Sequence, residues 1–236
     1  MKAHDPKDAR ERSPMTKVDL KKELDSYRAR HGEFRVAEVP PAQYLIVHGQ
    51  GDPNTAQEYA DAVAALYPVA YKLKFASKTE LDRDYVVMPL EALWWASDMD
   101  AFTTARDKSA WHWTAMILVP DWITTDMYDA VVAEVARKDP PACLDKVRLE
   151  TLREGRCVQT LHVGSYDDEA PVLAEMHHEF IPRAGLKMAG RHHEIYLSDP
   201  RRMQPSKLRT ILRQPVVPAE GGRSGRTRSA ASAHRQ

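Results

Sequence analysis

The chain has 236 residues, enough for one large domain or two small domains that pack tightly, and 43% of them are hydrophobic. Its 34 Lys and Arg residues balance its 34 Asp and Glu residues, so no overall field draws in nucleic acid or an anionic membrane. No apolar run approaches the roughly 20 residues that span a bilayer, and residues 1–14 contain no hydrophobic signal core, which together predict a soluble, cytoplasmic protein with no membrane partner.

The composition changes at both ends of the chain. Residues 1–17 are mostly charged and polar, and residues 218–236 are rich in Gly, Ser, Ala and Arg. Neither stretch can bury much apolar surface, so we expect a disordered N-terminus and a disordered basic tail around a folded domain at 18–217. Cys143 and Cys157 adjoin strand-like segments and are expected to be buried thiols rather than a disulfide.

Strand and helix signals alternate through the first half of the folded region. Residues 34–39 and 44–49 predict a β-hairpin joined at 40–42, and Asn54 is a candidate cap for a helix. The apolar residues from 55 to 66 recur at helical spacing. The other elements predicted for this half are strands at 71–75, 85–95 and 111–119 and a helix at 125–137.

The second half repeats this plan. Residues 147–152 and 156–163 predict a second hairpin, with Glu154 and Gly155 at its turn. The elements that follow are a helix at 169–181 and strands at 191–197 and 210–216. Hairpins separated by helices predict an α+β fold, in which antiparallel strands form a sheet with helices on one face.

Two pairs of similar stretches indicate an internal duplication. YLIVHGQGD at 44–52 and QTLHVGSYD at 159–167 each end a strand at Gly, pass an Asp and enter a helix. LEALW at 90–94 loosely matches HEIYL at 193–197. The halves predicted from these pairs run from about 34 to 119 and from about 146 to 217.

Aromatic side chains are the most informative feature of the sequence. Trp111 and Trp113 lie two apart on a predicted strand and so share a face, whereas Trp94 and Trp95 point in opposite directions. Core packing is the alternative for each single Trp, but the predicted helices already supply aliphatic core, so the set favours a ligand-binding wall. Indole faces bind cationic or electron-poor groups.

The predicted strand at 191–197 carries a carboxylate among bulky residues. Glu194 and Tyr196 share one face, and Ile195 lies on the other, which we expect to pack on the helices. A carboxylate in mid-strand is costly to bury unless it is paired or used. We therefore interpret Glu194 as a functional acid, with a salt-bridged surface residue as the alternative.

The sequence lacks the motifs of common cofactor and metal sites. It contains no GxGxxG, P-loop or GxSxG, and no HExxH or CxxC. His177 and His178 are adjacent, as are His192 and His193, and neighbouring rings point apart on a helix or a strand, so neither pair chelates a metal well. We therefore predict no cofactor and no metal.

Several longer stretches are specific when they are taken together. They are GQGDPN at 49–54, MPLEALWW at 88–95, HVGSYDDE at 162–169, EIYLSDP at 194–200 and KLRTILRQPV at 207–216. Through them the chain from residue 19 to residue 217 resembles the GyrI-like small-molecule-binding family, in its stand-alone branch. The resemblance implies two tandem strand–helix–strand–strand modules with a ligand cleft between them.

The resemblance also implies a function. Relatives sense drugs as parts of transcription activators, where a buried Glu meets cationic aromatic molecules, and Glu194 best matches that acid. Fewer than 35 residues precede the first predicted strand, too few for a helix-turn-helix domain. Stand-alone relatives hydrolyse cyclopropane-bearing DNA alkylators of the yatakemycin class within an aromatic cage.

By this resemblance the protein is a hydrolase that adds water to a hydrophobic, planar aromatic molecule. Its expected residues are Glu194 and Tyr196 in catalysis and Trp95, Trp111, Trp113, Tyr71 and Trp94 in ligand binding. Binding or sensing of drugs without turnover is the alternative. A third role, binding to DNA gyrase as the family name implies, gains little support from a neutral chain with no acidic, DNA-mimicking segment. The sequence does not fix the oligomeric state.

Overall fold

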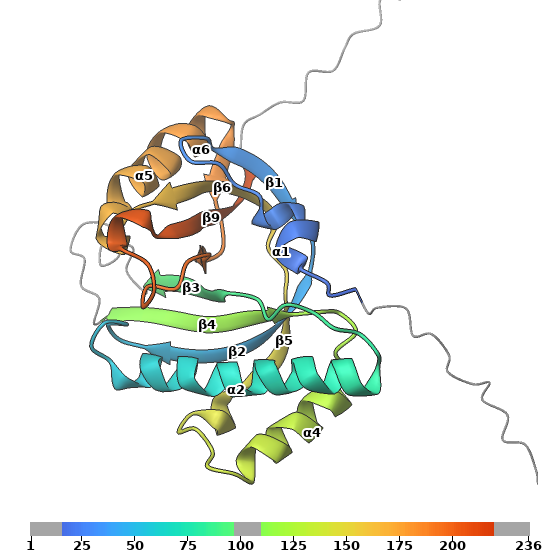
Figure 1. The fold of residues 1–236 in the computed structure, drawn as a ribbon. Coiled ribbons are helices and arrows are strands. Elements are labelled where there is room, and N and C mark those ends of the chain that lie inside the picture. The colour runs from blue at the N-terminus through green and yellow to red at the C-terminus, as the bar shows by residue number, and fades with distance from the viewer. Residues whose placement is uncertain (1–15, 97–109, 220–236) are drawn as a thin grey trace, which may run out of the picture.

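A nine-stranded antiparallel sheet forms the centre of the computed structural model, which describes residues 16–96 and 110–219 (Figure 1). Its strand order is β1-β6-β9-β8-β3-β4-β2-β5, and β7 pairs with β9 beside this path. The strands are β1 (Arg35–Val39), β2 (Ala42–Gln50), β3 (Leu90–Ala96), β4 (Trp111–Val119), β5 (Arg148–Leu152), β6 (Gly155–Val163), β7 (Leu186–Met188), β8 (His192–Tyr196) and β9 (Arg209–Pro218). The predicted α+β class is confirmed, while the ends predicted to be disordered lie almost wholly outside the described residues.

Two modules with the same topology build this sheet. In the first, β2 leads through helix α2 (Gln57–Glu80) to β3 and β4, and the strands are ordered β2-β4-β3. In the second, β6 leads through α5 (Ala170–Glu175) and α6 (Ile181–Arg183) to β8 and β9, ordered β6-β9-β8. The modules meet where β3 pairs with β8, with Ala92 opposite Glu194. The prediction of two tandem strand–helix–strand–strand modules is therefore confirmed.

Both predicted hairpins are wrong, because their strands do not pair with each other. β1 pairs with β6, and β2 pairs with β4 and β5. The same antiparallel register continues across the bend between β1 and β2 and the bend between β5 and β6. Val39 lies opposite Gly155 before the bends, and Ala42 lies opposite Leu152 after them. The segment of β1 and β2 and the segment of β5 and β6 thus form one long antiparallel ladder, which we call the shared ladder.

Helix α2 is longer than predicted and contains residues 71–75, so the strand predicted there is wrong. Pro68 lies inside the helix without ending it. The buried residues of α2 recur at helical spacing along its length: Ala62, Ala65, Leu66, Val69, Ala70, Leu73 and Ser77. The strand predicted at 85–95 begins only at Leu90, the start of β3, and Tyr85 before it forms an isolated bridge with Val18. The packing of one continuous face, rather than local propensity, sets the length of this helix.

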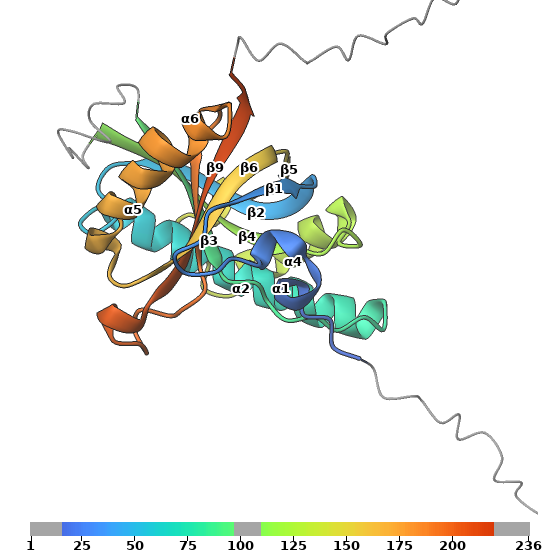
Figure 2. The ribbon, with the colours of Figure 1, turned by 90° about the horizontal axis from the view of Figure 1, so that it is seen from above.

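The helices of both modules pack on the same face of the sheet. Tyr59 of α2 contacts the ring of Trp113, and His177 of the second module contacts the ring of His192. Trp113 and His192 both lie opposite Trp94 in the strand register, so their side chains point to one side. Figures 1 and 2 show α2 along the first module and α5 and α6 along the second. We call this side the helix face.

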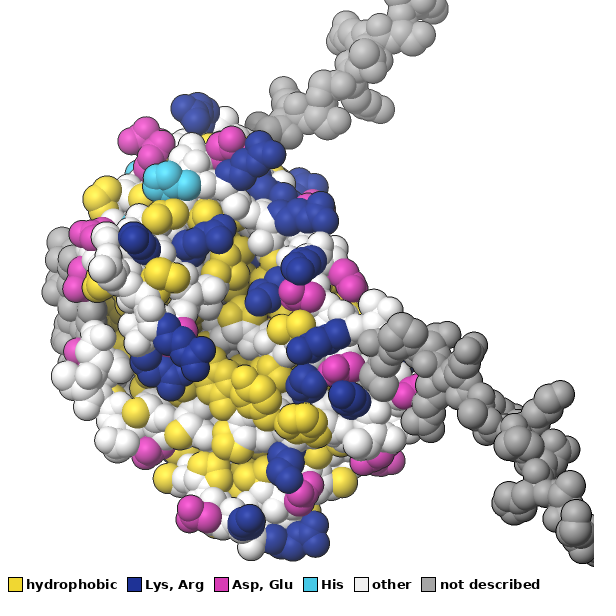
Figure 3. All heavy atoms as spheres, in the orientation of Figure 1, with side chains coloured by type: hydrophobic (Ala, Val, Ile, Leu, Met, Phe, Trp, Pro, Cys, Tyr) yellow, Lys and Arg dark blue, Asp and Glu magenta, His cyan; other side chains and the backbone are white. Residues whose placement is uncertain are grey.

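Short helical elements complete the fold. They are α1 (Leu20–Glu23), η1 (Asp25–Tyr27), α4 (Thr125–Ala136), η3 (Leu144–Lys146), η4 (Tyr166–Asp168), the π-helical turn η5 (Met176–Phe180) and η6 (Pro205–Lys207). The helix predicted at 125–137 is confirmed as α4, which packs on α2. Hydrophobic side chains gather over α2 and the strands next to it on the face in Figure 3. No helix in the described part of the chain combines the length and apolarity needed to cross a bilayer. Cys143 and Cys157 are buried free thiols, as predicted.

Candidate active site

Strand β8 directs successive side chains to opposite faces of the sheet. Glu194 and Tyr196 lie on the helix face, where the Tyr196 hydroxyl accepts a hydrogen bond from Trp94 Nε1 at 3.1 Å. His193 and Ile195 lie on the opposite face. The expectation that the Ile195 side packs on the helices is wrong. Both faces of β8 are covered, so an apolar side chain does not mark the helix side.

Six aromatic side chains gather beside Glu194 on the helix face. This aromatic cluster consists of Tyr59, Trp94, Trp111, Trp113, Tyr166 and Tyr196. Its ring centroids are 5.0 Å apart for Tyr59 and Trp113, 5.8 Å for Tyr59 and Trp94, 5.7 Å for Trp94 and Trp111, and 5.5 Å for Tyr166 and Tyr196. Tilted and edge-on rings at these distances attract one another, so the cluster is a rigid apolar wall.

The Glu194 carboxylate is held in place by neighbouring polar groups. Its side chain is only 13% exposed. The Tyr196 hydroxyl donates a hydrogen bond to Oε2 at 2.8 Å, and Nε2 of His192 lies 3.5 Å from Oε1. Burial, followed by the charge of Glu194, raises the pKa of Tyr196 well above its usual value, so the phenol keeps the proton that it donates. Trp94, Tyr196 and Glu194 therefore form a hydrogen-bonded relay across β3 and β8.

A cavity of about 360 Å³ adjoins this relay. Trp94 and His192 form part of its lining, and Trp95, His177, Gln214 and the segment Met188–Gly190 form the rest. Glu194 is not part of this lining, but its Oε1 lies 3.5 Å from Nε2 of His192, which is part of it. A volume of this size fits a small aromatic molecule.

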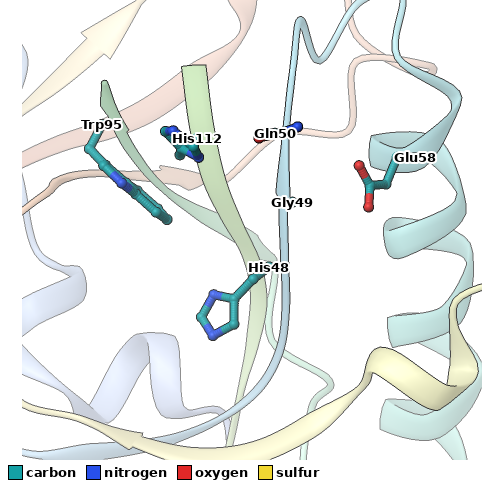
Figure 4. A pocket seen from close by; sticks show the side chains of 6 residues that line it. All are labelled: His48, Gly49, Gln50, Glu58, Trp95 and His112. Carbon is teal, nitrogen blue, oxygen red and sulfur yellow. The ribbon is translucent and has the colours of Figure 1, made fainter. Parts of the chain in front are cut away.

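Two of the residues predicted to bind ligand lie away from the aromatic cluster. Trp95 points to the opposite face, where its ring stacks on His112 with centroids 5.6 Å apart, although the residue also lines the 360 Å³ cavity. Trp95 also lines a second cavity, of about 330 Å³. Figure 4 shows Trp95 and His48 on one side of the strands and Glu58 on the other. Tyr71 is 50% exposed on α2. The other five predicted site residues are brought together.

The opposite face of β8 holds a buried ionic network. His193 lies 2.9 Å from both Glu91 and Glu154, and Arg213 donates to Glu154 at 2.8 Å. Tyr27 also donates to Glu91. Burial alone would raise the pKa of Glu154, but His193 and Arg213 outweigh it and lower the value to about 2. This network links β3, β8 and β9 on the face of the sheet opposite the aromatic cluster.

Sequence reasoning missed four residues of the site. Tyr59 comes from α2, where its spacing predicts only a helix. Tyr166 comes from η4, and the one feature of the sequence that points to it is its place in the repeated stretch at 159–167. Alternation along the strand places His192 on the face of Glu194 and Tyr196, but the sequence assigns neither His192 nor His177 a role beyond that of a poor metal ligand. Among the residues that the structure describes, no three His, Cys, Asp or Glu side chains are grouped to hold a metal ion.

Comparison with known proteins shows the family. The model of the GyrI-like small molecule binding domain matches residues 32–216. The chain belongs to the GyrI-like family. Its fold and small-molecule-binding character, expected from the sequence, are thereby established, and the relay and cavity lie within the matched residues.

Solved structures from Listeria innocua are similar to this GyrI-like chain. An uncharacterized conserved protein shares 38% identity at a TM-score of 0.78, covering 85% of this chain and 100% of its own. Two structures of a hydrolase each share 37% identity, with TM-scores of 0.75 and 0.76, and cover 85% and 86% of this chain and 100% of their own. No curated protein matched the chain.

Proposed function

We propose that this GyrI-like protein is a cofactor-free hydrolase that adds water to electrophilic, planar aromatic molecules, such as cyclopropane-bearing alkylators of the yatakemycin class. The observation that carries the proposal is the Glu194 carboxylate, held by Tyr196 in the cluster of six aromatic rings and near a cavity that Trp94 and His192 line. The Listeria hydrolases, at 37% identity over their whole length, support an enzyme rather than a passive binder.

The reaction needs one base and an electron-rich wall. Glu194 takes a proton from water as the water oxygen bonds to a carbon of the strained cyclopropane. The carbon–carbon bond of the ring breaks, and its electron pair moves into the conjugated carbonyl, which becomes a phenol when its oxygen takes a proton from solvent; Glu194 then returns its own proton to solvent. Indole and phenol faces stabilise the positive character at the attacked carbon. The strained ring supplies much of the driving force, so positioning and a general base suffice.

Tyr196 has a different role from the one that the resemblance implies. Its hydroxyl donates to Glu194 and accepts from Trp94, so its proton is already engaged with the carboxylate. We therefore assign Tyr196 to holding Glu194 in one orientation. Any hydrogen bond to the carbonyl oxygen, on which negative charge develops, would then come from another group.

Drug binding without turnover is the second candidate function. It is favoured by the same cluster, because a carboxylate framed by aromatic rings also suits a cationic aromatic ligand. The two candidates predict different products from the same mixture. A hydrolase releases a ring-opened product heavier by one water, whereas a binder returns the ligand unchanged.

Mass spectrometry of the protein with a cyclopropane-bearing alkylator separates these candidates. We expect the hydrated product to accumulate over many turnovers. Glu194→Gln should slow its formation by about 10²- to 10⁴-fold, the usual worth of a general base, while ligand affinity changes much less. Glu179→Gln, at an exposed position, is the matched control. Recovery of unchanged ligand from the wild type would leave only the binding role.

A further inference from the structure

The helix of the second module is interrupted by a π-helical turn at Met176–Phe180. Such turns are rare and often occur at functional sites, because the extra residue changes the direction of the side chains. Here His177 is buried, at 8% exposure, whereas the next residue, His178, is exposed. Within this turn the imidazole of His177 points inward, where it contacts His192 of the strand that carries Glu194.

His177 reaches the 360 Å³ cavity. It lines this space together with Trp94 and His192, and its ring meets that of His192 edge-on, with centroids 6.1 Å apart. Its Nε2 makes no hydrogen bond to any group in the described part of the chain. A buried nitrogen without a partner is costly, and this one borders a cavity that can hold a partner.

The imidazole of His177 is uncharged. Burial, and then the neighbouring His192, lower its pKa to about 3. A neutral imidazole has one N–H donor and one acceptor nitrogen, and so it can pair with a neutral polar group of a ligand. Gln214 also lines the cavity, but its amide nitrogen already donates to Ala189 O at 2.8 Å and to Pro215 O at 3.2 Å.

We propose that His177 donates a hydrogen bond from Nε2 to a carbonyl oxygen of the ligand, which makes aromatic ketones and related conjugated carbonyl compounds the preferred substrates. This inference rests on the proposed function and deepens it. In the hydrolysis above, negative charge develops on a conjugated carbonyl oxygen, and Tyr196 is not free to serve that oxygen. His177 and Glu194 both neighbour His192, with ring centroids 6.1 Å apart for His177 and an Nε2–Oε1 distance of 3.5 Å for Glu194, so the carbonyl end and the electrophilic carbon of one ligand can meet different groups.

The inference can be tested with two probes that differ by one carbonyl group. Binding of 9-fluorenone and of fluorene is measured by quenching of tryptophan fluorescence, with the wild type, His177→Leu and the matched control His178→Leu. We expect the wild type and His178→Leu to bind fluorenone about five- to tenfold more tightly than fluorene, the usual worth of one neutral hydrogen bond. His177→Leu should bind both probes with the affinity that the wild type has for fluorene.

Each outcome either supports or overturns the proposed hydrogen bond from His177 to the ligand. Fluorene binding to His177→Leu shows that the variant is folded, and its loss of preference for the ketone then supports the inference. A preference that survives in His177→Leu overturns the role of His177 but leaves the proposed hydrolase untouched, because that proposal is judged by product formation and by Glu194→Gln. Binding of neither probe to the wild type overturns the inference together with the cavity as a ligand site.

Discussion

Replacing Gly49 with Ala tests how rigidly the aromatic cluster is held. Gly49 on β2 lies opposite Trp113 on β4, and a Cβ at Gly49 would lie 2.2 Å from two carbons of the indole. Carbon atoms rest at about 3.5–4.0 Å, so the ring would have to move by about 1.3 Å or more. Trp113 has no exposed surface and is held edge-on by Tyr59 at 5.0 Å, so little room exists for that movement.

Overpacking of this kind costs about 1–3 kcal/mol of unfolding free energy, and each kcal/mol lowers the melting temperature of a domain this size by about 2–4 °C. Urea and thermal denaturation of Gly49→Ala measure the loss. Trp113→Phe should also destabilise, because it leaves a void, but a smaller ring makes room for the new methyl group. The double variant should therefore be at least about 1 kcal/mol more stable than additivity predicts. Additive losses would refute the claim that Gly49 and Trp113 are in contact.

Three further results are expected from the site and the network behind it. Tyr196→Phe leaves Glu194 without its donor at 2.8 Å and should slow formation of the hydrated product by about tenfold with the fold intact; an unchanged rate would count against the relay. Tyr71→Ala should leave fluorenone affinity within about twofold, because the side chain is half exposed and outside the cluster, and a larger loss would show a contact at that position. Glu154 has a folded-state pKa lowered from 4.5 to about 2, so the stability that it contributes is present above pH 4.5 and is lost as the pH falls toward 2. His193 has a folded-state pKa raised above 6.5, so its contribution is present below pH 6.5 and is lost as the pH rises through the folded value. Urea denaturation of the wild type and of Glu154→Gln across these two pH ranges checks the direction of both stability changes. A Glu154→Gln variant whose stability follows the wild-type pH profile would contradict them.

Local patterns predicted those parts of the fold that local packing determines. The strand at 111–119 and the helix at 125–137 agree with β4 and α4, because their periodicity is set within each segment. Residues 71–75 were misleading, since Tyr71 and Phe75 alternate with lysines as on a half-buried strand. In α2 these two aromatic side chains are exposed, and Leu73 between them is buried. The pairing of β1 with β6 joins residues more than a hundred positions apart, and nothing in either strand specifies the other.

The candidate site was predictable from its strands but not from its helices. Alternation placed Trp111 with Trp113 and Glu194 with Tyr196, as the structure has them. It could not decide between Trp94 and Trp95, which differ only in the direction that the strand register gives them. Tyr59 reaches the cluster and His177 reaches the cavity from helical segments whose positions depend on tertiary packing, so the sequence gives no sign of either contact.

The shared ladder makes the two halves of this polypeptide dependent on each other. If the backbone were cut in the connection between α4 and β5, each fragment would keep one strand of every pair in that ladder and would expose a long row of unsatisfied amide and carbonyl groups. Such fragments should aggregate when they are made alone and recover a native assembly only when they are mixed. The duplicated plan therefore describes one cooperative folding unit, in which damage to either half disables the whole.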